Sequence, residues 1–161
     1  MRKEEIMTSQ VSPRSTRAYE HVLEHLRAKR VRITETRKAI IAYMVDSKEH
    51  PSVEKIYKDL LPLYPSMSLA TVYNNLKVLV DEGFVEEIKI TNDSTTYYDF
   101  MGHDHINIVC ESCGKIVDFM DVELLDISKE AYEQTQFKIT KLQLLAYGIC
   151  PECQKKQENH R

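Results

Sequence analysis

The sequence predicts an α+β protein built in two parts. Three observations support this class: four stretches with apolar residues at helical spacing come first, two β-prone runs around a turn follow, and two Cys-x-x-Cys pairs enclose most of the remainder. Composition agrees, because 42% hydrophobic residues with four Gly and five Pro among 161 residues favour packed cores. We expect residues 1–100 to form the first part, with 1–15 flexible, and residues 101–161 to form the second, with 155–161 a polar tail.

Helical periodicity predicts the first three helices. The first covers about residues 16–29, and Thr34 is the expected N-cap of the second. His50-Pro51 then interrupts the helical pattern, because a residue before proline is driven out of the α region. Ser52 is the expected cap of the third helix, whose apolar residues recur every three or four positions.

The fourth helix carries the clearest surface pattern. Ser68 should cap it, and it should end at Gly83, which suits the left-handed C-terminal position. Its apolar face leaves another side with short polar and basic residues at three-residue steps, namely Thr71, Asn74 and Lys77. Such side chains can reach base edges and phosphates in a major groove.

Two β-prone runs, 84–90 and 95–100, surround the turn-forming segment 92–94. Helices followed by a hairpin in this order are typical of a winged-helix DNA-binding domain. A helical domain that binds protein, or that only packs, has the same order of elements, so both interpretations stay open here.

Charge is distributed unevenly along the chain. The net charge of −3 divides into 15 basic against 13 acidic residues over 1–91 and 7 against 12 over 92–161. Residues 14–38 alone hold eight basic and three acidic residues. The first part is therefore suited to face phosphates and the second would repel them, although a solvated helix face explains the basic residues equally well.

The four cysteines form two pairs, Cys110/Cys113 and Cys150/Cys153. Each pair can offer two thiolates to one ion, and together they complete the closed tetrahedral shell of a structural Zn²⁺ site. Disulfides, a redox pair and unrelated thiols are the alternatives. We expect the span between the pairs to hold a strand at 115–120, a helix at about 122–134 and a strand at 137–148.

Histidine and carboxylate residues gather just before the first cysteine pair. If residues 103–109 form a strand, His103, His105 and Asn107 share one face, which His50 and Asp118 can join. A mixed imidazole and carboxylate shell suits Fe²⁺, Mn²⁺ or Zn²⁺. Ordinary surface histidines and a small metallohydrolase site are the alternatives, but no clear general base accompanies the cluster, so we expect no enzyme and no small organic substrate.

Other features indicate where the protein works. The sequence has no apolar run long enough to span a membrane, and its start lacks the apolar core of a secretion signal. We therefore expect a cytoplasmic protein without a membrane partner, whose thiols stay reduced.

In combination, these motifs resemble the ferric uptake regulator (Fur) family over about residues 22–156. The resemblance is carried by Arg32-Ile33-Thr34 with Arg37, His50-Pro51, residues 68–76, Tyr98-Asp99-Phe100, Asp104-His105, residues 110–119 and residues 147–153. It implies a homodimeric transcriptional repressor with an N-terminal winged helix, a C-terminal α/β dimerisation domain and double-stranded operator DNA as partner. The DNA-facing residues that we expect are Ser68, Thr71, Tyr73, Asn74, Lys77, Arg32 and Arg37.

The resemblance also implies two metal sites. The four cysteines would hold structural Zn²⁺, and a regulatory Fe²⁺ or Mn²⁺ would bind His50, Asp99, His105 and Asp118. The sequence departs from the family pattern at Asn107, where the family has histidine, and His103 or His25 are candidate replacements.

Asp118 makes the chain resemble the peroxide-sensing members of the family, which carry aspartate at this position. In those members, bound ferrous iron leads to oxygen addition on a ligand histidine. An iron or manganese sensor without peroxide chemistry is the alternative.

Overall fold

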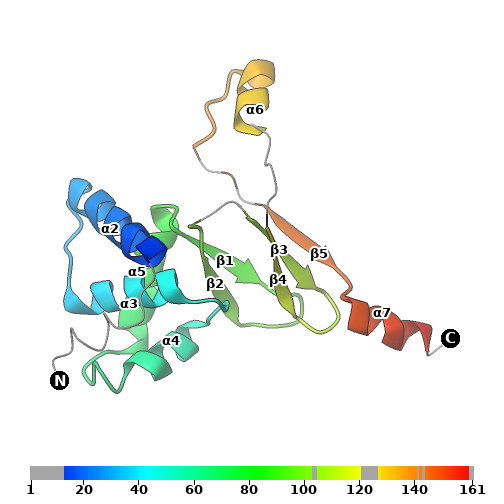
Figure 1. The fold of residues 1–161 in the computed structure, drawn as a ribbon, viewed down its shortest axis with the longest axis horizontal. Coiled ribbons are helices and arrows are strands. Elements are labelled where there is room, and N and C mark those ends of the chain that lie inside the picture. Colours follow the sequence, from blue (N-terminus) through cyan, green and yellow to red (C-terminus); the bar gives the residue numbers. More distant parts are fainter. Residues whose placement is uncertain (1–12, 103–104, 121–126, 141, 143, 160–161) are drawn as a thin grey trace. The chain divides into compact units, whose positions relative to one another are not determined.

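The computed structural model describes residues 13–102, 105–120, 127–140, 142 and 144–159 (Figure 1). The chain divides into two compact units. Unit 1 holds the described residues up to Glu87 together with Thr96–Gly102, and unit 2 holds Ile88–Thr95 and the described residues from 105 onwards. No helix within these described ranges is long and apolar enough to cross a membrane.

Unit 1 contains four helices followed by a two-stranded sheet, as the sequence predicts, except that the last two residues of the first strand, Ile88 and Lys89, belong to unit 2. The elements are α2 (Pro13–Ala28), α3 (Glu35–Asp46), α4 (Val53–Leu60), α5 (Leu69–Asp81), β1 (Val85–Lys89) and β2 (Thr96–Phe100). Helix α2 begins three residues before the expected start, because Pro13 is tolerated in a first turn where its missing N–H has no partner. The rest of the segment 1–15, expected to be flexible, lies outside the described residues.

Local side-chain hydrogen bonds fix where these helices begin. Thr34, Ser52 and Ser68 each accept a bond from the backbone N–H three residues on, at 3.1, 3.2 and 3.1 Å, so the three expected N-caps are confirmed. At the other end of α5, Gly83 takes a φ of +80°, and the N–H groups of residues 83 and 84 bond back to carbonyls in its last turn.

The core of unit 1 lies where the four helices meet the start of the sheet. Its fully buried side chains include Val22, Leu26, Ile40, Met44, Ile56, Val72, Leu76, Leu79 and Val85. Each contributes about 1.5–3 kcal/mol through burial. Helix α5 gives three of them, so its position is set by the core while its opposite side faces solvent.

Unit 2 is built on a three-stranded sheet with the order β4-β3-β5. The central strand β3 (His105–Cys110) pairs antiparallel with β4 (Ile116–Met120) and parallel with β5 (Leu145–Gly148). Helix α6 (Ile127–Thr135) lies between β4 and β5 in the chain, and α7 (Pro151–Glu158) follows β5.

One expectation for unit 2 is wrong in its extent, and another gains a secondary structure that the sequence analysis did not assign. Of the described residues in the strand expected over 137–148, only β5 is a strand, because the parallel register pairs Leu145 with Asn107 and residues 137–140 precede the part of the chain that lies beside β3. The expected polar tail, 155–161, is helical as far as Glu158, since Pro151 presets the first turn and the lysines of the last turn complement the helix dipole. The beginning of the helix expected at 122 lies outside the described residues.

The turn between β1 and β2 belongs to unit 2. It is stabilised by Asn92, which takes a φ of +66°. A Cβ on Gly114 would lie 3.5 Å from the Ile90 side chain, and the Tyr147 hydroxyl donates a hydrogen bond to the Lys89 carbonyl at 3.1 Å. The hairpin tip therefore packs on the loop that follows the first cysteine pair.

Candidate functional site

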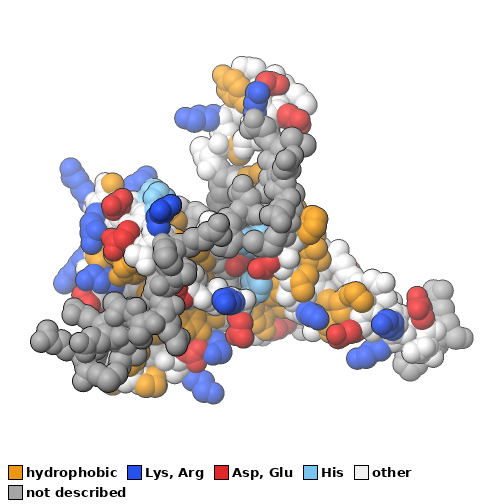
Figure 2. Space-filling view, viewed as in Figure 1, with side chains coloured by type: hydrophobic (Ala, Val, Ile, Leu, Met, Phe, Trp, Pro, Cys, Tyr) orange, Lys and Arg blue, Asp and Glu red, His pale blue; other side chains and the backbone are white. Residues whose placement is uncertain are grey.

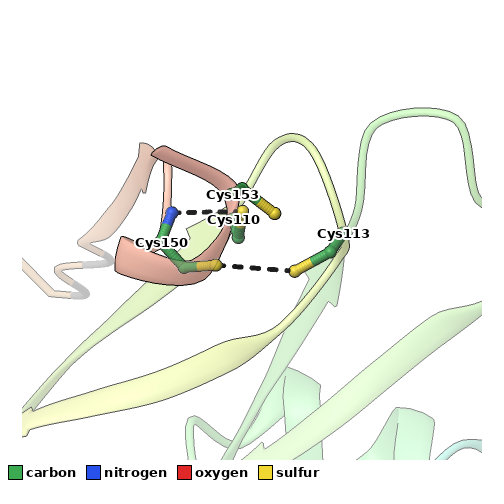
Figure 3. A group of neighbouring side chains, drawn as sticks. All are labelled: Cys110, Cys113, Cys150 and Cys153. Carbon is green, nitrogen blue, oxygen red and sulfur yellow. Dashed lines mark hydrogen bonds between the residues drawn. The ribbon is translucent and has the colours of Figure 1, made fainter. Parts of the chain in front are cut away.

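The four cysteines converge from both ends of unit 2 (Figure 3). Cys110 ends β3 and Cys113 lies in the turn after it, whereas Cys150 caps α7 and Cys153 lies in its first turn. The four sulfur atoms all lie within 4.8 Å of one another, and none of these cysteines forms a disulfide. Thus β3 and α7 bring together the two pairs that lie far apart in the sequence.

Backbone geometry shapes the turn that carries the first cysteine pair. Gly114 takes a φ of +75°, which a residue with a side chain rarely adopts, and its N–H closes the turn by donating to the Cys110 carbonyl at 2.9 Å. The Glu111 N–H donates to the Gly148 carbonyl at 2.8 Å, which fixes this turn beside the end of β5. The turn that carries Cys110 and Cys113 is therefore held by backbone bonds that do not depend on an ion.

The electrostatics of the cluster favour a bound cation. The backbone N–H of Cys150 donates to the Cys110 sulfur at 3.3 Å and lowers the pKa of that thiol to about 6. The Lys115 N–H lowers the pKa of Cys113, but the neighbouring thiols and burial outweigh it and raise the pKa to about 11. Four thiolates this close repel one another unless a cation lies among them, and four sulfur ligands without an open position fit structural Zn²⁺.

Unit 1 holds a pair formed by a histidine and a carboxylate. His50 lies just before α4 and Asp99 on β2, and the Nε2 and Oδ1 atoms of the pair are 3.8 Å apart. Each side chain is 12% exposed. The pair is held in place by backbone contacts, since the Tyr98 N–H donates to the Pro51 carbonyl at 2.9 Å.

Unit 2 holds the other residues that the sequence analysis names as candidate metal ligands. His105 and Asn107 lie on the same buried face of β3, and Asp118 is the direct partner of Asn107 in the antiparallel register with β4. His103 lies outside the described residues. Apart from the four cysteines, the part of the chain that the structure describes holds no group of three or more His, Cys, Asp or Glu ligand atoms this close together.

His25 has a partner that sequence reasoning missed. Its Nε2 atom lies 2.7 Å from Oε2 of Glu82, the C-cap residue of α5. The rings of His21 and His25 also contact Phe84 edge to face, with centroids 5.9 and 5.0 Å away. The four-residue spacing of the two histidines was visible in the sequence, but the tertiary contact across 57 positions was not.

The exposed side of α5 has the composition expected of a polynucleotide-binding surface. Tyr73 is 51% exposed, and Asn74 and Lys77 are exposed beside it. Thr71 is half-buried, and its hydroxyl lies 2.9 Å from that of Ser68. Figure 2 shows Lys and Arg side chains gathered over α2 in the same unit.

The two arginines expected to face DNA differ in their surroundings. Arg32 is exposed, whereas Arg37 is half-buried and its Nε donates to the Asn75 side-chain carbonyl at 2.8 Å. Asn75 was not predicted to have a role. It follows the exposed Asn74 on α5 but is buried, and the sequence alone does not show which of two adjacent asparagines faces the interior.

Comparison with known proteins identifies the family to which this chain belongs. Residues 28–147 match the Ferric uptake regulator family. The chain belongs to the Fur family. This membership confirms the resemblance drawn from the motifs, and with it the α+β class in which helices and a hairpin precede a small mixed domain with a four-cysteine cluster.

Several relatives of this Fur-family chain have names that describe peroxide sensing. It is 45% identical over 141 residues to the peroxide-responsive repressor PerR of Staphylococcus aureus, covering 85% of this chain and 95% of that protein. A structure of PerR from Streptococcus pyogenes is 72% identical, with a TM-score of 0.52, and covers 84% and 92% of the two chains. The Campylobacter jejuni peroxide stress regulator is 32% identical, with a TM-score of 0.65, and covers 81% and 98%.

Proposed function

We propose that the protein is a metal-dependent transcriptional repressor that binds operator DNA as a homodimer in the cytoplasm and releases it in response to peroxide. The observation that carries the proposal is the 45% identity to a peroxide-responsive repressor along 95% of that protein's length. Identity spread over nearly the whole of a relative supports a shared fold, and with it a shared general function.

The four-cysteine cluster supports a structural role for Zn²⁺. Cys110, Cys113, Cys150 and Cys153 supply four soft ligands, which is the complete shell that Zn²⁺ favours, so no position is left for a reacting molecule. Bound there, the ion would tie the end of β3 to the start of α7.

For the regulatory ion, Fe²⁺ or Mn²⁺, the proposed ligands are His50, Asp99, His105 and Asp118. Imidazole and carboxylate groups suit both ions, and the His50–Asp99 pair is nearly shielded from solvent. Bound ferrous iron would supply the reducing electrons for a reaction with peroxide. His50 and His105 are the proposed points of oxygen addition, and losing either imidazole would weaken the site.

Asn107 leaves this ligand set one imidazole short of the family pattern, because an amide oxygen is the weaker ligand for these ions. His103 and His25 are the candidate replacements, and His25 would have to exchange Glu82 for the ion. We expect His25→Ala or His103→Ala to lower Mn²⁺ affinity, with His21→Ala as the matched control. Wild-type affinity in both variants would dismiss both replacements.

The proposed DNA surface is the exposed side of α5 with the N-cap before it. Its residues are Ser68, Thr71, Tyr73, Asn74 and Lys77, joined by Arg32 from the loop before α3. Short polar groups, an aromatic ring and a lysine on one helix provide contacts for base edges, thymine methyls and phosphates.

The proposed dimer interface lies in unit 2. Large apolar side chains are exposed there, including Val117, Phe119, Ile127, Tyr132, Phe137, Ile139 and Leu142. Helix α6 has no buried residue of its own. Apolar surface on this scale is covered in stable proteins, and a second copy of the chain is the partner that the family's homodimeric arrangement supplies.

The decisive experiment compares Fe²⁺-loaded and Mn²⁺-loaded protein after treatment with dilute peroxide. The probe is a duplex selected from a random pool for binding to the Mn²⁺-loaded protein. We expect only the Fe²⁺-loaded protein to lose this duplex and to gain one oxygen atom on peptides that contain His50 or His105.

The second candidate is an iron or manganese sensor without peroxide chemistry. Asn107 favours it, because a changed ligand set changes the reactivity of the ion. Equal behaviour of the two metal forms would support this candidate and reject the peroxide proposal. Equal DNA binding by the protein with and without the regulatory ion would reject both.

A further inference from the structure

A chain of hydrogen bonds inside unit 1 connects the loop before α3 to the backbone of α5. The Arg37 guanidinium donates from Nε to the Asn75 side-chain oxygen at 2.8 Å and from Nη1 to the Arg32 carbonyl. The Asn75 amide nitrogen in turn donates to the Thr71 carbonyl at 2.7 Å. Thr71 is one of the residues that we propose to face DNA.

Asn75 lies where an amide needs these partners. It is 7% exposed and flanked on the same face of α5 by Val72, Leu76 and Leu79, which are buried in the core. A buried amide left without hydrogen-bond partners costs about 1–3 kcal/mol. Arg37 donates to the side-chain oxygen of Asn75, and the Thr71 carbonyl accepts from its nitrogen. Loss of the Arg37 contact would therefore leave a buried oxygen without its donor.

Arg37 is less exposed than an arginine that binds phosphate, and its N–H groups already have partners within the protein. Its guanidinium is half-buried, and burial lowers its pKa, whereas the neighbouring Arg32 is exposed. Two of its N–H groups are directed at fixed acceptors within unit 1. A planar guanidinium can hold two such acceptors in one geometry, which the single ammonium of lysine cannot reproduce.

We propose that Arg37 is a positioning residue, which acts through Asn75 and the Arg32 carbonyl to fix the orientation of α5 for sequence-specific DNA binding. This inference rests on the proposed function. Contacts to base edges depend on orientation within a fraction of an ångström, whereas contacts to phosphates tolerate more movement. Loosening α5 should therefore weaken binding to the selected duplex more than binding to unrelated DNA.

The test measures the affinity of metal-loaded variants for the selected duplex and for a scrambled duplex over a range of salt concentrations. We expect Arg37→Gln to lower affinity for the selected duplex about tenfold, with little change for the scrambled one and no change in salt dependence. Arg32→Gln is the matched control: loss of a phosphate contact lowers affinity for both duplexes and reduces the slope of log affinity against log salt by about one.

Two further variants show whether Arg37 acts through Asn75. Arg37→Lys keeps the charge but cannot make both bonds, so we expect it to match Arg37→Gln, whereas a phosphate contact would survive this change. Asn75→Ala should also lower affinity about tenfold, and the double variant should be no weaker than either single variant. Full binding by Arg37→Lys, or additive losses in the double variant, would overturn the proposal.

Hydrogen exchange gives a readout that does not need DNA. Backbone amides of α5 should exchange faster in Arg37→Gln, Arg37→Lys and Asn75→Ala than in the wild type, but not in Arg32→Gln. If the wild-type protein selects no duplex, the proposed function fails. If α5 exchange is unchanged in the three variants, the positioning role fails, whatever DNA is bound.

Discussion

Replacing Ser68 by alanine should separate the folding of α5 from its binding of DNA. The Ser68 hydroxyl accepts the Thr71 N–H at 3.1 Å, so alanine removes the N-cap of the helix. Loss of such a cap costs about 1 kcal/mol of unfolding free energy. For a cooperative unit of this size, the corresponding decrease in Tm is about 4–8 °C. Urea and thermal unfolding followed by far-UV circular dichroism measure both quantities.

Two companion variants sharpen this prediction. Ser68→Asp keeps an acceptor at the cap, and its negative charge suits a helix N-terminus, so stability should stay within about 0.5 kcal/mol of the wild type. The same charge would repel phosphates, so affinity for the selected duplex should fall. Ser52→Ala removes the equivalent cap of α4, whose N–H donor lies at 3.2 Å, and should lower stability as much as Ser68→Ala without weakening DNA binding.

The reasoning is refuted by either of two results. Unchanged stability in Ser68→Ala would show that the hydrogen bond seen at α5 contributes nothing to its formation. Wild-type DNA affinity in Ser68→Asp would show that this end of α5 does not approach phosphates.

Three other changes test the core, the cysteine cluster and the proposed interface. Leu76→Ala, at a side chain with no exposed surface, should lower unfolding free energy by about 2–5 kcal/mol in urea titrations; a loss below 1 kcal/mol would contradict the packing described. Cys153→Ser should reduce zinc content, measured by plasma emission, from about one ion per chain to well below it, and full retention would mean that zinc lies elsewhere. Phe119→Lys, on the exposed side of β4, should shift the mass measured by sedimentation from dimer towards monomer; an intact dimer would place the interface elsewhere.

Features governed by local chemistry were predictable from the sequence. The N-caps Thr34, Ser52 and Ser68 depend on bonds three residues away, and Gly83 depends on its own backbone freedom. The convergence of the cysteines followed from the spacing within each pair, because four thiolates have few other uses in a reduced protein.

Features that depend on a distant partner were not predictable. The start of β5 depends on its parallel register with β3, in which Leu145 pairs with Asn107, so apolar residues such as Phe137 and Ile139, well before β5, lie outside the sheet despite their β propensity. Helix α7 has almost no apolar periodicity, and only Pro151 in its first turn and the lysines in its last turn could have indicated it. The contacts of His25 with Glu82 and of Arg37 with Asn75 arise from helix packing, which a one-dimensional pattern does not report.

Because the tip of the β1–β2 hairpin packs on the loop after Cys113, the chain cannot be cut into two separate domains at an arbitrary position. The chain leaves unit 1 after Glu87, returns at Thr96 and leaves again after Gly102, so the turn of the hairpin belongs with the second unit. A proteolytic fragment ending at Gly102 would keep both strands but lose the support of Gly114 and Tyr147. Chimaeras between relatives should therefore exchange residues 88–95 together with the C-terminal unit. A junction placed only after the hairpin would pack the turn of one protein against the unit 2 of another.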